Sequence, residues 1–92
     1  MKEQAFENVW DALEDNQRDA ERMKLRSELM IAVCAYLSNH KGTQQEKADW
    51  LGITQPRLND LIKGKINKFS LEALVDIAIA AGMRVSMQVE AA

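Results

Sequence analysis

The chain has 92 residues, enough for one modest domain, and its 47% hydrophobic content with only four glycines and one proline favours a compact helical fold. Its single cysteine excludes an intramolecular disulfide and suits a reducing compartment. No apolar run reaches the ~18 residues of a membrane span, and the first residues are acidic where a secretion signal would be basic. We therefore expect a soluble, cytoplasmic protein.

The net charge of −2 hides an uneven distribution. Residues 1–39 carry five basic and eight acidic side chains, whereas residues 40–70 carry six basic and three acidic ones. Residues 71–92 are acidic again. Because local potential governs encounter with a polyanion, the basic middle of the chain is the part suited to nucleic acid.

Residues 1–17 are predicted to form an amphipathic helix, since Phe6, Val9, Trp10 and Leu13 follow helical spacing. A helix this short is marginal alone in water, so its apolar stripe must dock on something. Two alternatives remain open, a lid on the protein's own core or a segment that binds a partner protein. The polar residues 16–20 can either bend the chain or continue the helix.

A longer helix is predicted over residues 19–39. Cys34 lies on its apolar stripe and is interpreted as a small buried hydrophobic residue rather than a nucleophile. His40 follows the helix without Cys, His or carboxylate neighbours at ligand spacing, so it is interpreted as a surface residue and not a metal ligand. The stripe consists of Leu29, Met30, Val33, Cys34 and Leu37.

Residues 43–65 predict two short helices joined at a glycine. Thr43 and Glu46 form a T-x-x-E capping box, and Gly52 breaks the first helix after Leu51. Thr54 caps the second helix, where a proline is tolerated in the first turn. Ala48 provides the small residue that two steeply crossing helices need, and the apolar anchors are Leu51, Ile53, Leu58 and Leu61. This pattern indicates a helix-turn-helix.

The second of these helices has the chemistry of a recognition helix. With Leu58, Leu61 and Ile62 facing inward, the candidates for reading bases are Gln55, Pro56, Arg57, Asn59 and Asp60. Gln and Asn pair with adenine, Arg with guanine, and Asp with the cytosine amino group; Asp60 alternatively bonds to Arg57. The candidates for contacts with DNA phosphates are Thr43, Gln44, Thr54, Lys63, Lys65, Lys68 and Ser70. For each of the lysines, the alternative is that the side chain is simply solvated.

Ser70 is predicted to cap a last helix that ends at Gly82. Beyond it, Met83, Val85, Met87 and Val89 alternate with polar residues, which predicts a β-strand. The chain offers this strand no partner, so we expect it to pair with a second copy and form a dimer. A disordered tail is the alternative.

Together these elements predict an all-α fold, a compact bundle of about five helices with one C-terminal β-strand for dimer pairing. The single domain divides into an N-terminal helix (1–17), a helix-turn-helix core (18–82) and a dimerisation strand (83–92).

The stretch L-G-I-T-Q-P-R-L-N-D-L-I-K-G-K-I-N-K-F-S-L-E-A-L resembles the xenobiotic-response-element (XRE) class of helix-turn-helix regulators, which includes the lambdoid phage repressors. With the upstream F-x-x-V-W-x-A-L and the closing A-G-M-R-V-S-M, it looks like the HigA-type antitoxins over about residues 6–89. The resemblance implies a dimer that represses its own operon and binds a RelE-like ribonuclease toxin. Trp50 stands where that family usually has a polar residue, so it joins Phe6, Val9, Trp10 and Leu13 as a candidate toxin contact.

We therefore expect a dimeric repressor that binds an inverted repeat in double-stranded DNA and acts as an antitoxin. A stand-alone phage-type repressor is the alternative. An enzyme is not expected, because the sequence has no paired catalytic carboxylates, no nucleophile–base arrangement and no phosphate-binding glycine loop. No cofactor or metal is expected. A purely structural bundle would leave the basic region and the turn glycine unexplained.

Overall fold

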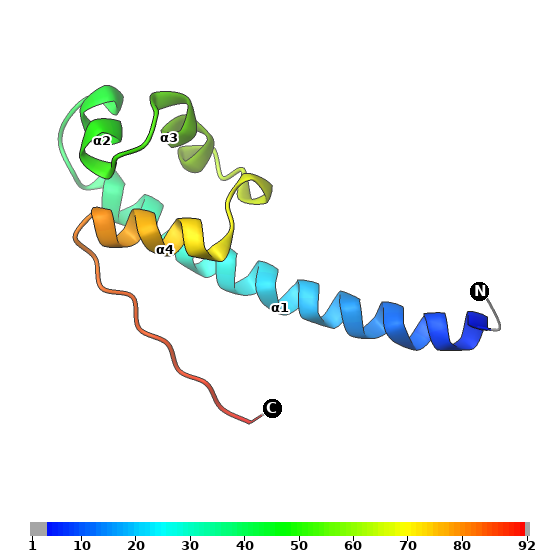
Figure 1. The fold of residues 1–92 in the computed structure, drawn as a ribbon. Coiled ribbons are helices and arrows are strands. Elements are labelled where there is room, and N and C mark those ends of the chain that lie inside the picture. The colour runs from blue at the N-terminus through cyan, green and yellow to red at the C-terminus, as the bar shows by residue number, and fades with distance from the viewer. Residues whose placement is uncertain (1–3, 92) are drawn as a thin grey trace.

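The computed structural model describes the backbone of residues 4–91 and the side chains of residues 16–91. In these residues the chain forms four α-helices and one short 3₁₀-helix. The elements are α1 (Gln4–Ser38), α2 (Gln44–Leu51), α3 (Gln55–Ile62), η1 (Ile66–Lys68) and α4 (Leu71–Ala80). Helices α2, α3 and α4 gather on the C-terminal half of α1, while its N-terminal half projects away from them (Figure 1).

The expected count of about five helices is wrong, because the two helices predicted at the N-terminus are one. Helix α1 runs unbroken through the polar residues 16–20 and across the predicted boundary at residue 17. This segment contains neither Gly nor Pro, and its Gln, Arg and Ala residues are good helix formers. Asp19 and Arg22, one turn apart, form an ion pair at 3.3 Å. The polar composition therefore marks an exposed helix surface and not a bend.

The core lies between the C-terminal half of α1 and the three helices that cover it. Leu58 and Leu61 of α3, Leu74 of α4 and Val33 of α1 are fully buried, as is Phe69 just before α4. Phe69 precedes the N-cap Ser70, and Leu74 is four residues beyond that cap. Their joint burial is the pattern of a hydrophobic staple, which fixes the angle at which the chain enters a helix. The segment between α3 and α4 is therefore fixed at both ends, by the buried Leu61 before it and the buried Phe69 after it.

Ile62 departs from the expectation that it faces inward, because its side chain is 46% exposed. Successive helical residues are rotated by about 100°, and the buried side of α3 is centred between Leu58 and Leu61. Ile62 therefore falls at the edge of the buried side.

The tail beyond α4 runs as extended chain away from the helices (Figure 1). The predicted strand is not formed, since residues 4–91 contain no β-strand. A strand is defined by hydrogen bonds to a neighbouring backbone, and within one chain the tail lies beside no other extended segment. Val85, Met87 and Val89 are 39%, 79% and 84% exposed, so the alternation of the sequence is present but unpaired.

Candidate nucleic-acid interface

Helices α2 and α3 form the predicted helix-turn-helix. The capping box of α2 is complete, because the Glu46 amide donates to Thr43 Oγ1 at 3.1 Å and the Thr43 amide donates to Glu46 Oε1 at 2.8 Å. Gly52 ends α2 in the left-handed conformation with φ of 73°, which a side chain would strain. Ala48 is completely buried where the helices meet. Each of these predicted roles is confirmed.

Helix α3 begins at the N-cap Thr54, whose hydroxyl accepts from the Arg57 amide at 3.2 Å. Pro56 stands in the first turn, where its missing N–H breaks no helical hydrogen bond. Gln55 and Pro56 are exposed, and Asn59 is partly exposed on the same helix. Because Leu58 and Leu61 hold the opposite side in the core, the N-terminal end of α3 presents polar groups to solvent.

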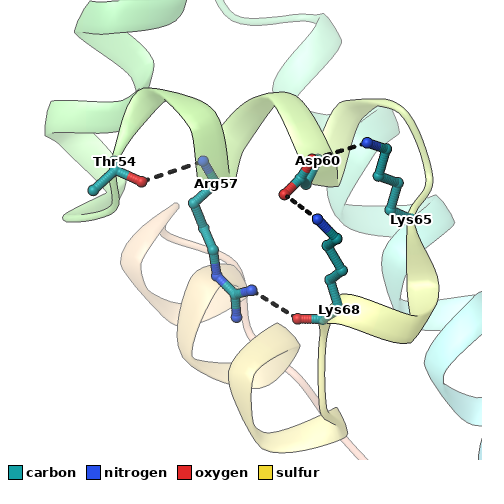
Figure 2. Close-up of polar contacts among 5 residues, drawn as sticks. All are labelled: Thr54, Arg57, Asp60, Lys65 and Lys68. Carbon is teal, nitrogen blue, oxygen red and sulfur yellow. Dashed lines mark hydrogen bonds and ion pairs between the residues drawn. The ribbon is translucent and has the colours of Figure 1, made fainter.

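Arg57 is directed along the protein surface toward the segment before α4. Its Nη1 donates to the carbonyl oxygen of Lys68 at 2.7 Å, and its guanidinium carbon lies 4.0 Å from the centre of the Phe69 ring. Figure 2 shows the side chain reaching from α3 down to the segment before α4. This contact could not be predicted from local spacing, because Arg57 and Lys68 are eleven residues apart.

Asp60 is bonded to two lysines and not to Arg57. One carboxylate oxygen lies 3.4 Å from Lys65 Nζ and the other lies 3.5 Å from Lys68 Nζ (Figure 2). Desolvation acts to raise the pKa of Asp60, but the hydrogen bonds and charges of the two lysines outweigh it and lower that pKa below its ordinary value. The structure thus shows an arrangement that neither sequence alternative for Asp60 included.

The remaining phosphate candidates lie on the surface of the same region. Gln44 and Lys63 are exposed, and the hydroxyl groups of Thr43, Thr54 and Ser70 cap the helices α2, α3 and α4. Ser70 Oγ accepts from the Ala73 amide at 3.1 Å. Capped helix N-termini and lysines both suit phosphate oxygens, so the phosphate contacts of these residues stay a prediction.

Side-chain contacts with backbone carbonyls fix α1 against α2 and α3. The half-buried Cys34 thiol donates to the carbonyl of Leu61 at 3.3 Å, and burial raises its pKa, which keeps it protonated. Lys47 Nζ donates to the carbonyl of Leu37 at 3.1 Å. Sequence reasoning missed both contacts, because each joins residues far apart in the chain.

The candidate partner contacts fall in two places. Trp50 is 42% exposed on α2, and its ring centre lies 4.8 Å from that of His40, whose centre lies 4.7 Å from that of Tyr36, with the ring planes tilted by 34° and 49°. His40 is therefore partly covered by aromatic rings. The candidates Phe6, Val9, Trp10 and Leu13 lie on the helical backbone of α1, but their side chains are outside the described part of the structure.

Two further features bear on the kind of protein this is. In the part of the chain with described side chains, no group of His, Cys, Asp or Glu residues is arranged to hold a metal ion. None of the described helices is long and apolar enough to cross a membrane.

The sequence matches a protein family described as a helix-turn-helix domain over residues 12–90. Because this match covers most of the chain, the protein belongs to that family of DNA-binding regulators. No curated protein matches the sequence significantly.

Proposed function

We propose that this helix-turn-helix protein is a sequence-specific transcriptional repressor of the XRE type that binds an inverted-repeat operator as a homodimer and represses its own promoter. The observation that carries the proposal is the exposed N-terminal end of α3, which its buried side holds in a fixed orientation. A recognition helix enters the major groove with this end. Gln55 and Asn59 have the amide groups that pair with adenine, and Pro56 offers an apolar contact for a thymine methyl group.

The two copies are proposed to associate through their tails. Met83, Val85, Met87 and Val89 would pair with the same residues of a second chain across a two-fold axis. Support comes from the exposed apolar side chains of Val85, Met87 and Val89 in the tail and of Ile79 near the end of α4, which is 59% exposed, whereas Met83 packs partly buried against the core. Such a pairing would bury this surface and satisfy the free backbone groups of the tail. A two-fold dimer then matches an inverted repeat with half-sites about 34–36 Å apart, or a multiple of that spacing.

Selection of binding sites from a random duplex library, followed by a footprint on the DNA upstream of the gene, tests the proposal. We expect an inverted repeat to be enriched and then protected. Gln55→Ala should relax the preference at one position in each half-site. The matched control is Gln17→Ala, which removes the same amide from the exposed surface of α1 and should leave the selected sequence unchanged. Failure of the wild-type protein to enrich any sequence would refute a specific repressor.

The second proposed activity is that of an antitoxin in a type II toxin–antitoxin operon, which neutralises a RelE/HigB-like ribonuclease toxin. It is supported by the projecting half of α1, where residues 16–22 are exposed, and by the exposed Trp50. A helix surface of this kind is suited to a partner protein, since no other element of the described chain covers it. A stand-alone repressor without a toxin partner is the alternative.

A gene for a small basic ribonuclease beside this one would favour the antitoxin. Co-expression of that ribonuclease with the full chain should then restore growth, whereas a chain lacking residues 1–17 should not, although it still binds the operator. The Trp50→Ala variant tests the second contact in the same assay. If the shortened chain and the variant protect cells as well as the wild type does, the toxin-binding surface lies elsewhere.

A further inference from the structure

We propose that Arg57 and Asp60 act as a clasp, which holds the segment 65–69 against α3 and sets Lys65 and Lys68 in place for the DNA backbone, and that neither residue reads a base. The clasp is defined by the contacts of Arg57 with Lys68 and Phe69 and by those of Asp60 with Lys65 and Lys68 (Figure 2). The proposal rests on the DNA binding proposed above and assigns these residues their part in it.

The Arg57 half of the clasp holds the guanidinium against the segment before α4. A bidentate contact with guanine needs two N–H groups on one edge of the guanidinium to point at the base. In the structure one N–H of Nη1 is bonded to the Lys68 carbonyl at 2.7 Å, and the group lies over the buried Phe69 ring. A charged donor to a carbonyl and a cation over an aromatic face are both favourable, so leaving this position would cost free energy.

The Asp60 half brings two cations to one anion. The Asp60 side chain is only 20% exposed, whereas Lys65 and Lys68 are 48% and 57% exposed. A carboxylate between two ammonium groups reduces their repulsion and restricts their side chains while leaving their outer surfaces open. The lysines are therefore oriented before any phosphate arrives.

The same carboxylate also limits how strongly the protein binds DNA of any sequence. Non-specific binding is almost entirely electrostatic, so a negative charge between the two lysines weakens it. Binding to the operator carries the same penalty but also draws on base contacts from the exposed end of α3. Asp60 thereby weakens binding to DNA of every sequence without touching a base.

The first experiment uses no DNA and follows amide hydrogen exchange in the full chain. The amides of Lys65, Lys68 and Phe69 bond to carbonyls within this region, so they report on its order. Arg57→Ala should speed their exchange by about tenfold or more, as expected when a hydrogen bond to a charged group is lost. Lys63→Ala, one residue beyond α3, is the control and should change little. Equal exchange in wild type and Arg57→Ala would overturn the clasp.

The second experiment measures the affinity of Asp60→Asn for the selected operator and for a random duplex of equal length over a range of salt concentrations. We expect tighter binding to the random duplex, a salt slope steeper by about 0.9 and an unchanged preferred sequence. An altered preferred base, or weaker binding confined to the operator, would assign Asp60 to base reading and overturn the proposal.

An altered preferred base in a binding-site selection with Arg57→Ala would also overturn the proposal. The two experiments separate the clasp from the proposed function. If the wild-type chain selects no sequence, the repressor proposal fails, and the exchange measurement still decides whether Arg57 orders the segment.

Discussion

The two halves of α1 lie in opposite surroundings although they form one continuous helix. In the C-terminal half Met30, Val33 and Leu37 are buried beneath α3 and α4, whereas residues 16–22 of the projecting half are all exposed. Hydrogen bonding and propensity carry the helix through both halves, but among the side chains from residue 16 onward only those of the C-terminal half contribute to the core. The difference shows that continuity of a helix and burial of its surface have separate causes.

The extended tail resembles the projecting half, because residues 16–22 of that half and Val85, Met87 and Val89 of the tail are exposed, while Met83 still packs against the core. The C-terminal half of α1 and the helices α2, α3 and α4 pack around a core that includes Leu58, Phe69 and Leu74, and we call this part of the molecule the head. We therefore expect changes in the head to alter folding, and changes in the projecting half or the tail to alter association. Four predictions test the contrast between these regions and the DNA binding proposed for the head.

Removal of residues 83–92 should abolish the dimer and leave the head folded. Because linking two binding modules raises avidity by roughly 10²–10⁴-fold, the shortened protein should lose operator affinity by a factor in that range. Sedimentation measures its mass, and thermal unfolding shows whether the head is intact. A shortened chain that remains dimeric and retains its affinity would show that the head alone associates.

Leu58→Ala should destabilise the head by about 2–5 kcal/mol, since it leaves a cavity at a fully buried position. Leu25→Ala makes the same chemical change at an exposed position of α1 and should cost less than about 1 kcal/mol. Denaturant unfolding of both variants provides the measurement. Similar losses would mean that the exposed surface of α1 around Leu25 is part of the folded core in solution.

Lys63→Gln should reduce the slope of log affinity against log salt by about 0.9, as expected for one lost phosphate contact. Lys24→Gln, an exposed position on α1, should leave the slope unchanged. Fluorescence anisotropy on the same duplex compares the two variants. A reduced slope for Lys24→Gln would show that α1 also touches DNA.

Acid should open the Asp60 ion pairs only at low pH. The pKa of Asp60 is lowered below its ordinary value of 3.8, so the stabilisation it provides is complete above that value and is lost as pH falls through the lowered pKa. An NMR titration of the Asp60 carboxyl should therefore give a midpoint below 3.8. The double variant Lys65→Gln/Lys68→Gln should raise the midpoint, and an unchanged midpoint would show that the lysines do not stabilise the carboxylate.

Several features of the fold were predictable because they depend on residues close together in sequence. The N-caps Thr43, Thr54 and Ser70 each reach an amide three residues ahead, so the helix starts follow from local spacing. The buried stripe of α1 was likewise predicted from its helical period. The staple of Phe69 with Leu74 could also have been predicted from the sequence, because an apolar residue stands just before a capping serine.

The helix-turn-helix could be predicted from the sequence alone, because capping residues, the turn glycine and apolar spacing act within a few residues of one another. The contacts of Arg57 and Asp60, in contrast, are set by the tertiary structure. Their partners lie in the segment after α3, and that segment folds back because Phe69 is buried in the core. The same long-range packing left Ile62 at the edge of the core and the tail without a neighbouring strand. Such contacts depend on how elements meet in space, which local spacing does not encode.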